Sequence, residues 1–235
     1  RPSKPTPETL TEFRSFLGDA DFDLGIAHDG DADRIVIVDR NGEIVHEDTI
    51  VAILAGHYTR RYTEEHGEGA PTPVVVTTPN ASGRIDEQVT AAGGRVDRVQ
   101  LGGLHEGIAA VGDDEQVVFA AEPWKHIHPD FGGWIDGVAS AAVLTRLVAA
   151  EGLASLREPI TERPYRKVSC ACPDNAKAAA MADLEAALPE TFPDDSWLLV
   201  RPSGTEPYIR LYAESDDVDA LVDEAEAVIG SVVDV

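Results

Sequence analysis

The sequence predicts an α/β protein in which a domain built on a parallel sheet is followed by a small α+β domain. The first observation behind this prediction is a β-branched run at 74–78, followed by a helix at 83–92 and a strand at 95–101. A helix that connects two strands in this way normally makes them parallel. The second observation is a pair of strands near the C-terminus, joined by the short segment 201–207 and flanked by helices, which is typical of an α+β domain.

Each element is predicted from its local pattern. The N-terminal residues 1–11 are rich in Pro and polar residues, which is typical of a linker. Asn41-Gly42 follows a β-branched run and indicates a hairpin turn. Ser82 can cap the helix after it, and Gly93-Gly94 ends that helix. The expected helices cover 7–18, 48–62, 83–92, 136–150, 175–188 and 218–229, and the expected strands cover 35–39, 44–46, 74–78, 95–101, 116–122, 165–172, 197–201 and 208–214.

The net charge excludes one class of partner. The 235 residues contain 43 Asp and Glu but only 19 Lys and Arg, which gives a formal charge of -24 at pH 7. This charge repels a phosphate backbone, so we expect no nucleic-acid partner. No apolar run is long enough to span a membrane, so we expect no membrane partner. Abundant carboxylates with only four Lys predict a salt-adapted cytoplasmic protein, and an ordinary acidic protein is the alternative.

The two cysteines, Cys170 and Cys172, lie two positions apart in a predicted strand. Their side chains then point to the same face but are poorly placed for a mutual disulfide. No further ligands for a zinc site are evident near them. Two free thiols fit the reducing cytoplasm.

The strongest local signal is the segment Asp29-Gly30-Asp31-Ala32-Asp33-Arg34. Three carboxylates at alternate positions can converge on one hard cation, and Mg²⁺ prefers such oxygen ligands. Gly30 lets the backbone bend so that they converge. The loop is not an EF-hand, because its sixth position is Arg34 and its twelfth is Arg40. A solvated acidic turn is the alternative interpretation.

The second signal is the segment from Arg201 to Pro207, followed by Arg210. It offers arginine forks, the hydroxyls of Ser203 and Thr205, and backbone N–H groups beside Gly204. These groups are typical of a phosphate-binding loop without a Walker lysine. An ordinary Pro/Gly turn between two strands is the alternative.

In this order and separation, the two motifs resemble the α-D-phosphohexomutase family, which includes phosphoglucomutase, phosphomannomutase and phosphoglucosamine mutase. His28 to Arg34 resembles the metal-binding loop of that family, and Arg201 to Arg210 resembles its C-terminal phosphate-binding loop. Pro5 to Leu10 resembles the stretch shortly before the metal loop. The resemblance spans essentially the whole chain.

Family members have four domains. The resemblance implies that 1–45 is the end of the second domain, 46–155 is the third and 156–235 is the fourth; a composition change at 152–164 independently predicts the last boundary. The first domain of the family carries a catalytic phosphoserine in a Thr-Ala-Ser-His-Asn-Pro-like loop. Asn80-Ala81-Ser82-Gly83 does not match that loop. The phosphoserine is therefore expected on an N-terminal domain outside these 235 residues, which becomes an expected partner.

The resemblance also implies a mechanism. The phosphoserine gives its phosphoryl group to a hexose phosphate, and the resulting hexose bisphosphate turns over and returns its other phosphate. Mg²⁺ on Asp29, Asp31 and Asp33 would neutralise the transferring group, and Arg34 would add a second, catalytic positive contact. The loop after Arg201 would hold the phosphate that does not react. The net reaction is the interconversion of hexose 1-phosphate and hexose 6-phosphate, with mannose or glucose as the expected sugar.

The sugar-selecting loop of the family reads approximately Gly-Glu-Glu-Ser-Gly-His, and Ala121 to His126 aligns with it. Glu122 can accept hydrogen bonds from sugar hydroxyls. Trp124, in place of the serine, can stack on a sugar or block it, or can be an ordinary aromatic residue. His126 and His128 are either family-like loop residues or polar surface. The expected substrate-binding residues are Glu122, Trp124, His126, Arg201, Ser203, Gly204, Thr205 and Arg210.

Two further positions depart from the family pattern: Leu104 replaces a lysine that often contacts substrate, and Ile135 replaces an arginine. These departures, with Trp124, favour an alternative function of another class. In this alternative the chain is a divergent, non-catalytic protein that binds sugar phosphates or has a regulatory role. A general Mg²⁺-dependent phosphatase is a weaker alternative. Its Asp-x-Asp-x-Thr nucleophile motif is not present here, because Asp33 stands where the Thr would be.

Overall fold

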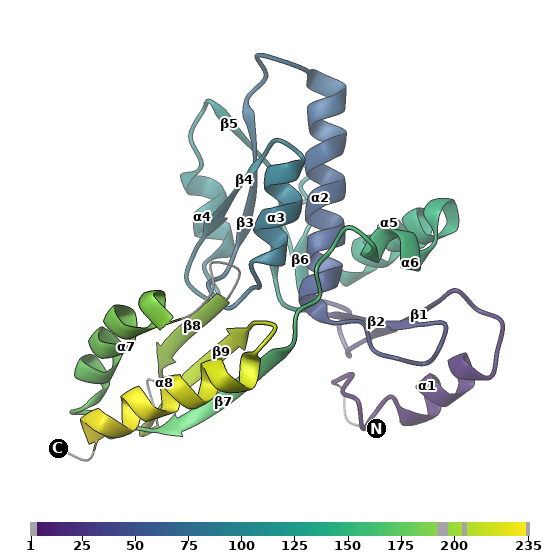
Figure 1. Cartoon of the computed structure of the whole chain (residues 1–235). Coiled ribbons are helices and arrows are strands. Elements are labelled where there is room, and N and C mark those ends of the chain that lie inside the picture. Colours follow the sequence, from purple (N-terminus) through teal and green to yellow (C-terminus); the bar gives the residue numbers. More distant parts are fainter. Residues whose placement is uncertain (1–3, 192–196, 204–205, 234–235) are drawn as a thin grey trace. The chain divides into compact units, whose positions relative to one another are not determined.

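The computed structural model describes residues 4–191, 197–203 and 206–233. The chain divides into two compact units, Arg1–Thr161 and Glu162–Val235 (Figure 1). Each unit has its own hydrophobic core. The elements of the first unit are α1 (Thr11–Gly18), β1 (Leu24–His28), β2 (Ile35–Asp39), α2 (Glu47–His66), β3 (Thr72–Thr77), α3 (Arg84–Ala91), β4 (Arg95–Arg98), α4 (Leu104–Ala110), β5 (Glu115–Glu122), β6 (Lys125–Ile127), α5 (Gly137–Glu151) and α6 (Leu153–Arg157). Those of the second unit are β7 (Tyr165–Ala171), α7 (Lys177–Thr191), β8 (Trp197–Pro202), β9 (Tyr208–Glu214) and α8 (Val218–Val233).

The main sheet of the first unit has the strand order β4-β3-β5-β6. Strand β3 is parallel to both β4 and β5, as the strand–helix–strand pattern predicts. Its valines alternate between the faces: Val75 belongs to the core with α2 and α3, whereas Val74 and Val76 pack with α4. Helices therefore cover both faces, with α2 and α3 on one side and α4 on the other (Figure 1).

A separate two-stranded ladder, β1 with β2, carries the acidic loop between its strands. The expected return strand at 44–46 is wrong, because only Ile44 forms an isolated bridge to Val38. The partner of β2 is instead β1, a segment that is not among the expected strands. The turn at 41–42 is held by a backbone bond from Gly42 N–H to the carbonyl of Asp39 at 3.0 Å.

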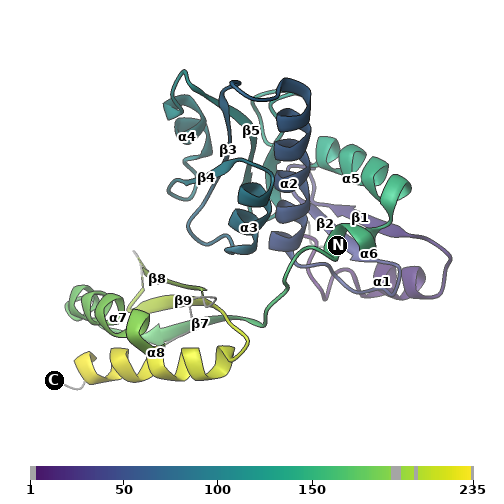
Figure 2. The same ribbon diagram turned by 45° about the horizontal axis from the view of Figure 1, so that its top comes forward.

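The second unit is a three-stranded antiparallel sheet with the order β7-β9-β8. Helices α7 and α8 pack on one face of it (Figure 2), where Ile209 and Leu211 meet Leu184 and Ile229. Cys170 and Cys172 are free and buried in the same core. Burial is the main cause that raises the pKa of Cys170, to about 12.

The predicted fold class is confirmed: an α/β domain with a mostly parallel sheet precedes a small α+β domain. The division between the units falls inside the composition change at 152–164. The finer boundary between 45 and 46 stays a prediction. Elements β1, α4, α6 and β6 are additional, and β4 ends at Arg98 rather than at 101. Within the described residues, no helix combines the length and the apolar character needed to cross a bilayer.

Candidate functional site

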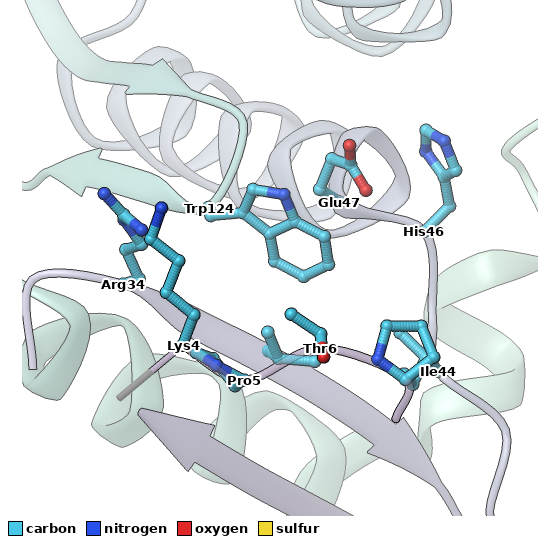
Figure 3. A pocket seen from close by; sticks show the side chains of 10 residues that line it. Lys4, Pro5, Thr6, Arg34, Ile44, His46, Glu47 and Trp124 are labelled. Carbon is cyan, nitrogen blue, oxygen red and sulfur yellow. The ribbon is translucent and has the colours of Figure 1, made fainter. Parts of the chain in front are cut away.

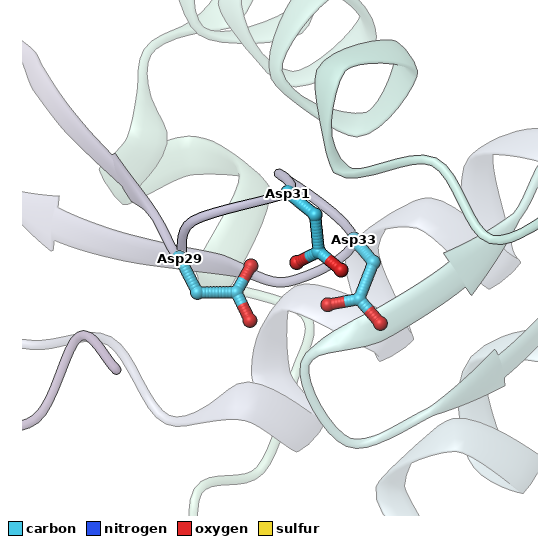
Figure 4. A group of neighbouring side chains, drawn as sticks. All are labelled: Asp29, Asp31 and Asp33. Carbon is cyan, nitrogen blue, oxygen red and sulfur yellow. The ribbon is translucent and has the colours of Figure 1, made fainter. Parts of the chain in front are cut away.

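The acidic loop connects the end of β1 to the start of β2. Asp29, Asp31 and Asp33 each offer one carboxylate oxygen, and these oxygens all lie within 4.8 Å of one another (Figure 4). Ala32 has a φ of 58°, in the left-handed region that favours glycine, so the loop turns sharply between the last two carboxylates. The backbone thus brings three alternate side chains to one side, as the sequence spacing predicts.

The backbone of this loop is held from two further elements. His28 Nδ1 donates to the carbonyl of Arg34 at 2.8 Å, and Gly137 N–H donates to the carbonyl of Ala32 at 3.1 Å. Gly137 is the first residue of α5, which begins after the N-cap Asp136. A Cβ on Gly137 would lie 2.7 Å from the carbonyl oxygen of Ala32 and 3.0 Å from that of Arg34. Only a glycine lets the start of α5 approach the loop this closely.

Two cations accompany the three carboxylates. Arg34 Nε lies 3.6 Å from Asp29 Oδ2 and 3.8 Å from Asp33 Oδ1. Lys125 Nζ lies 2.6 Å from Asp33 Oδ2. The hydrogen bond from Lys125 is the largest cause that holds the pKa of Asp33 below its usual value. Asp33 is therefore ionised at neutral pH and available as a ligand.

The donor set fits Mg²⁺. Three carboxylate oxygens are hard ligands, and with all of them within 4.8 Å of one another, small side-chain adjustments can bring them onto one small cation. A divalent cation also offsets the repulsion that three neighbouring carboxylates exert on one another. Lys125 was not among the expected site residues, because its contact with Asp33 depends on a pairing across more than ninety positions of sequence.

Lys125 lies at the tip of the β5–β6 hairpin. Glu122 pairs with Lys125 across the hairpin, and Trp124 occupies the turn with a φ of 72°. The carbonyl of Trp124 accepts a hydrogen bond from Ile35 N–H at 3.1 Å, and Arg34 forms an isolated antiparallel bridge with Lys125. The hairpin tip is thereby joined to the start of β2, directly after the acidic loop.

Trp124 and Arg34 line one pocket of about 400 Å³ in the first unit. In Figure 3 the indole ring faces the proline-rich N-terminal segment across this pocket, and Arg34 lies at one side of it. The wall of the pocket is mostly apolar, and it includes the indole ring of Trp124 and the guanidinium group of Arg34. An aromatic ring can stack on the face of a sugar, and a guanidinium group can pair with an anion, so the pocket suits a small molecule that has both. The remaining lining residues are Lys4, Pro5, Thr6, Pro7, Val36, Ile44, His46 and Glu47.

Three other residues considered for the sugar loop, Glu122, His126 and His128, do not line this pocket. Glu122 is half-buried and its carboxylate accepts from Gly102 N–H. His126 is only 1% exposed, because α5 covers the face of β6 on which it lies, and its Nδ1 is 2.8 Å from Ser140 Oγ on that helix. The structure thus does not bring His126 to the pocket. His128 is buried too, between Ser140 and Tyr58, and Leu104 is a core residue on α4.

The predicted phosphate-binding loop belongs to the second unit, where it joins β8 to β9. Arg201 and Arg210 are directly opposite each other in that ladder. Residues directly opposite share one face of the sheet, and like charges there repel, so a bound anion would relieve the repulsion. Arg210 Nη2 donates to the hydroxyl of Tyr208 at 2.6 Å. Gly204 and Thr205 lie outside the described residues.

Lys177 is a further residue of this loop that sequence reasoning missed. Its ammonium group is buried at the start of α7 and donates to the carbonyls of Ser203 at 2.6 Å and Glu206 at 2.8 Å. Ser203 N–H in turn donates to the carbonyl of Tyr208 at 3.0 Å, which closes the base of the loop. The only sequence signal for this role is the rarity of lysine in the chain.

Comparison with protein families identifies two matches that together span most of the chain. Residues 46–166 match the description "Phosphoglucomutase/phosphomannomutase, alpha/beta/alpha domain III", and residues 168–231 match "Phosphoglucomutase/phosphomannomutase, C-terminal domain". The first match alone covers just over half of the chain.

Curated relatives agree with these matches. A phosphopentomutase of Thermococcus kodakarensis and a probable phosphoglucosamine mutase of Methanopyrus kandleri are each 38% identical over 233 residues. Both alignments cover 92% of this chain and 49% of the relative. The chain therefore spans about half the length of these relatives.

Solved structures have the same fold. A phosphoglucomutase/phosphomannomutase family protein from Burkholderia thailandensis matches with a TM-score of 0.74 at 19% identity, over 97% of this chain and 50% of that one. The N-acetylphosphoglucosamine mutase of Aspergillus fumigatus, solved in complex with GlcNAc-6P and magnesium, matches with a TM-score of 0.66 at 17% identity. That match covers 94% of this chain and 52% of the other.

Proposed function

The chain belongs to the α-D-phosphohexomutase family of phosphoglucomutases and phosphomannomutases, and we propose that it is the metal-binding and phosphate-binding half of a phosphosugar mutase. The observation that carries this proposal is the convergence of Asp29, Asp31 and Asp33 beside Arg34. A site of this charge suits a reaction that moves a phosphoryl group between two hydroxyls of one sugar.

We assign each motif one role in that reaction. Asp29, Asp31 and Asp33 would hold Mg²⁺, which supplies charge neutralisation at the phosphoryl group in transit. Arg34 would contact that group from the side of Asp29. Arg201 and Arg210, with the Ser203 loop that Lys177 supports, would hold the phosphate that does not react. The phosphoserine that exchanges phosphoryl groups with the sugar would come from a domain outside these 235 residues.

The sugar is proposed to bind in the pocket under Trp124. The family resemblance favours a hexose, so the proposed reaction is the interconversion of hexose 1-phosphate and hexose 6-phosphate through a bisphosphate. A pentose phosphate is a second candidate, because one relative at 38% identity is a phosphopentomutase. The indole of Trp124 fills space that a serine would leave open, and this also favours a smaller sugar.

The test is a mutase assay in the presence of a serine-bearing first domain, in one chain or as a second polypeptide. Glucose, mannose, glucosamine and ribose 1-phosphates are offered in turn. Asp31→Ala is expected to abolish turnover, whereas Asp113→Ala removes the same charge from an exposed loop and is expected to leave it unchanged. Arg201→Ala is expected to raise KM more than it lowers kcat. Full turnover with Asp31→Ala would overturn the metal assignment, and tight binding of a sugar phosphate without turnover of any would favour the non-catalytic alternative.

We also propose that the protein is salt-adapted. A formal charge of -24 in 235 residues makes carboxylates repel one another at low ionic strength, and salt screens that repulsion. The melting temperature is expected to rise steadily between 0.1 and ~2 M KCl. A melting temperature that falls over this range would contradict the proposal.

A further inference from the structure

We propose that Lys125, which the family motifs do not assign, is a positioning residue that sets the charge of the acidic loop: it weakens metal binding and strengthens the binding of phosphate to the metal-loaded site. This inference rests on the proposed function. The carrying contact is the 2.6 Å approach of Lys125 Nζ to Asp33 Oδ2. Both side chains are about three-quarters buried, at 25% and 27% exposure, so solvent screens this ion pair less than an ordinary surface pair.

The fold holds the ammonium group in place. Lys125 begins β6, its backbone pairs with Glu122, and an isolated bridge joins it to Arg34. These contacts fix the backbone within reach of Asp33 regardless of the side chain. The hydrogen bond between Ile35 N–H and the carbonyl of Trp124 anchors the hairpin a second time. The ammonium group is therefore not needed to hold the hairpin, which leaves its charge as the property that matters.

Formal charges show what that ammonium changes. The three carboxylates with Arg34 and Lys125 carry a formal charge of -1, and a bound divalent cation makes it +1. Without Lys125 the same loop would carry -2 when empty and 0 when loaded. A cation binds better to the more negative empty loop, whereas a phosphate dianion binds better to the more positive loaded one. Lys125 therefore acts in opposite directions on the two ligands.

The position is also a departure from the family pattern. The sugar loop that the chain resembles has a glycine where Lys125 stands, so no ammonium group can come from that residue in such a loop. The lysine expected three positions after Leu101 is replaced by Leu104, which is buried in the core. Lys125 thus places a cation at the reacting centre by another route.

The test uses isothermal titration of the 235-residue chain with Mg²⁺, and then of the Mg²⁺-saturated chain with inorganic phosphate. All proteins carry Arg201→Ala and Arg210→Ala, so that the anion reports on the acidic loop rather than on the second unit. Lys125→Met is expected to bind Mg²⁺ about three- to tenfold more tightly and phosphate at least threefold more weakly, the size expected for one charge removed a few ångströms away. Lys125→Arg keeps the charge and is expected to match the parent within about twofold. Lys167→Met, a loss of the same charge in the second unit, is the control.

The opposite signs separate this role from a merely structural one, because a damaged loop would bind both ligands more weakly. Weaker or unchanged Mg²⁺ binding in Lys125→Met, or unchanged phosphate binding, would overturn the inference. Should Lys125→Met unfold, Lys125→Gln provides the same loss of charge with a polar side chain. A parent chain that binds no Mg²⁺ would overturn the proposed function as well, whereas a parent that binds both ligands without a response to Lys125→Met would overturn only this inference.

Discussion

The acidic loop and the phosphate-binding loop are built in opposite ways. The acidic loop is held by residues from three separated parts of the chain: its own strand ends, the β5–β6 hairpin tip and the start of α5. Among the described residues, the phosphate-binding loop is closed mainly by its own hairpin. Two other parts of the chain add to it: Lys177 donates to the carbonyls of Ser203 and Glu206, and Cys172 N–H donates to the carbonyl of Pro207 at 2.9 Å. Local sequence therefore specifies the second loop more completely than the first, and distant substitutions are expected to damage the first loop more.

The largest expected effect comes from Gly137→Ala. The added methyl group would meet two backbone carbonyl oxygens, which cannot rotate away, so the start of α5 must move off the loop. We expect a loss of about 3 kcal/mol in unfolding free energy and at least tenfold weaker Mg²⁺ binding. The control is Gly133→Ala, where no atom lies within 4 Å of the added Cβ. Equal stability and equal metal binding of the two variants would break the comparison.

Mild acid is expected to destabilise the first unit selectively, because all seven histidines lie in it. Burial is the main cause that lowers the pKa of His126 to about 3 and that of His128 to about 4. In the unfolded chain both titrate near 6.5. Their contribution to stability is therefore complete above pH 6.5 and is lost as the pH falls toward 4. Each of these two histidines lowers the free energy of unfolding by roughly 1.4 kcal/mol per pH unit in that range.

Hydrogen exchange at pH 7.5 and 5.5, corrected for the intrinsic rates, measures this difference unit by unit. The protection of β3 and α2 is expected to fall, and that of β9 is expected to stay the same within error. Equal losses of protection in both units would contradict the assignment of the acid sensitivity to the buried histidines.

Lys177→Met is expected to affect the phosphate-binding loop alone. The change removes two hydrogen bonds to the carbonyls of Ser203 and Glu206 and an ion pair with the exposed carboxylate of Asp174 at 2.5 Å. We expect a loss of about 1–3 kcal/mol in the free energy of phosphate binding, because the two carbonyls lose their donor. Mg²⁺ binding is expected to stay within twofold of the parent, a difference of at most ~0.4 kcal/mol in binding free energy. Titrations of the variant with phosphate and with Mg²⁺ check this prediction. A loss of affinity confined to Mg²⁺ would contradict it.

The smallest expected effect is that of Ala32→Gly. Ala32 has a φ of 58°, which glycine adopts without strain, so the variant is expected to be more stable by about 0.5 kcal/mol in urea unfolding. The effect is small because glycine also gains freedom in the unfolded chain. A loss of stability above about 1 kcal/mol would show that Ala32 contributes packing that its backbone conformation does not indicate.

The fold class, strand β2 and the β8–β9 hairpin could be predicted from sequence because their signals are local. The alternating carboxylates of Asp29, Asp31 and Asp33 are also a local signal, and the loop does bring them together. Strand β6 has only three residues, too few to show a period, so neither the inward turn of His126 nor the contact of Lys125 could be seen. The role of Gly137 depends on a close approach between α5 and the loop, which no local pattern encodes.

The most direct measurement is anomalous diffraction from crystals of the 235-residue chain soaked in Mn²⁺, which takes the same oxygen ligands as Mg²⁺. We expect one strong peak in the acidic loop, with Asp29, Asp31 and Asp33 each giving an oxygen to it and Lys125 still in contact with Asp33. A chain that carries Asp31→Asn is expected to lose the peak. Strong Mn²⁺ peaks only at other carboxylates, or three aspartates that turn away from one another in the presence of Mn²⁺, would contradict the proposal that this loop is the metal centre of a phosphosugar mutase.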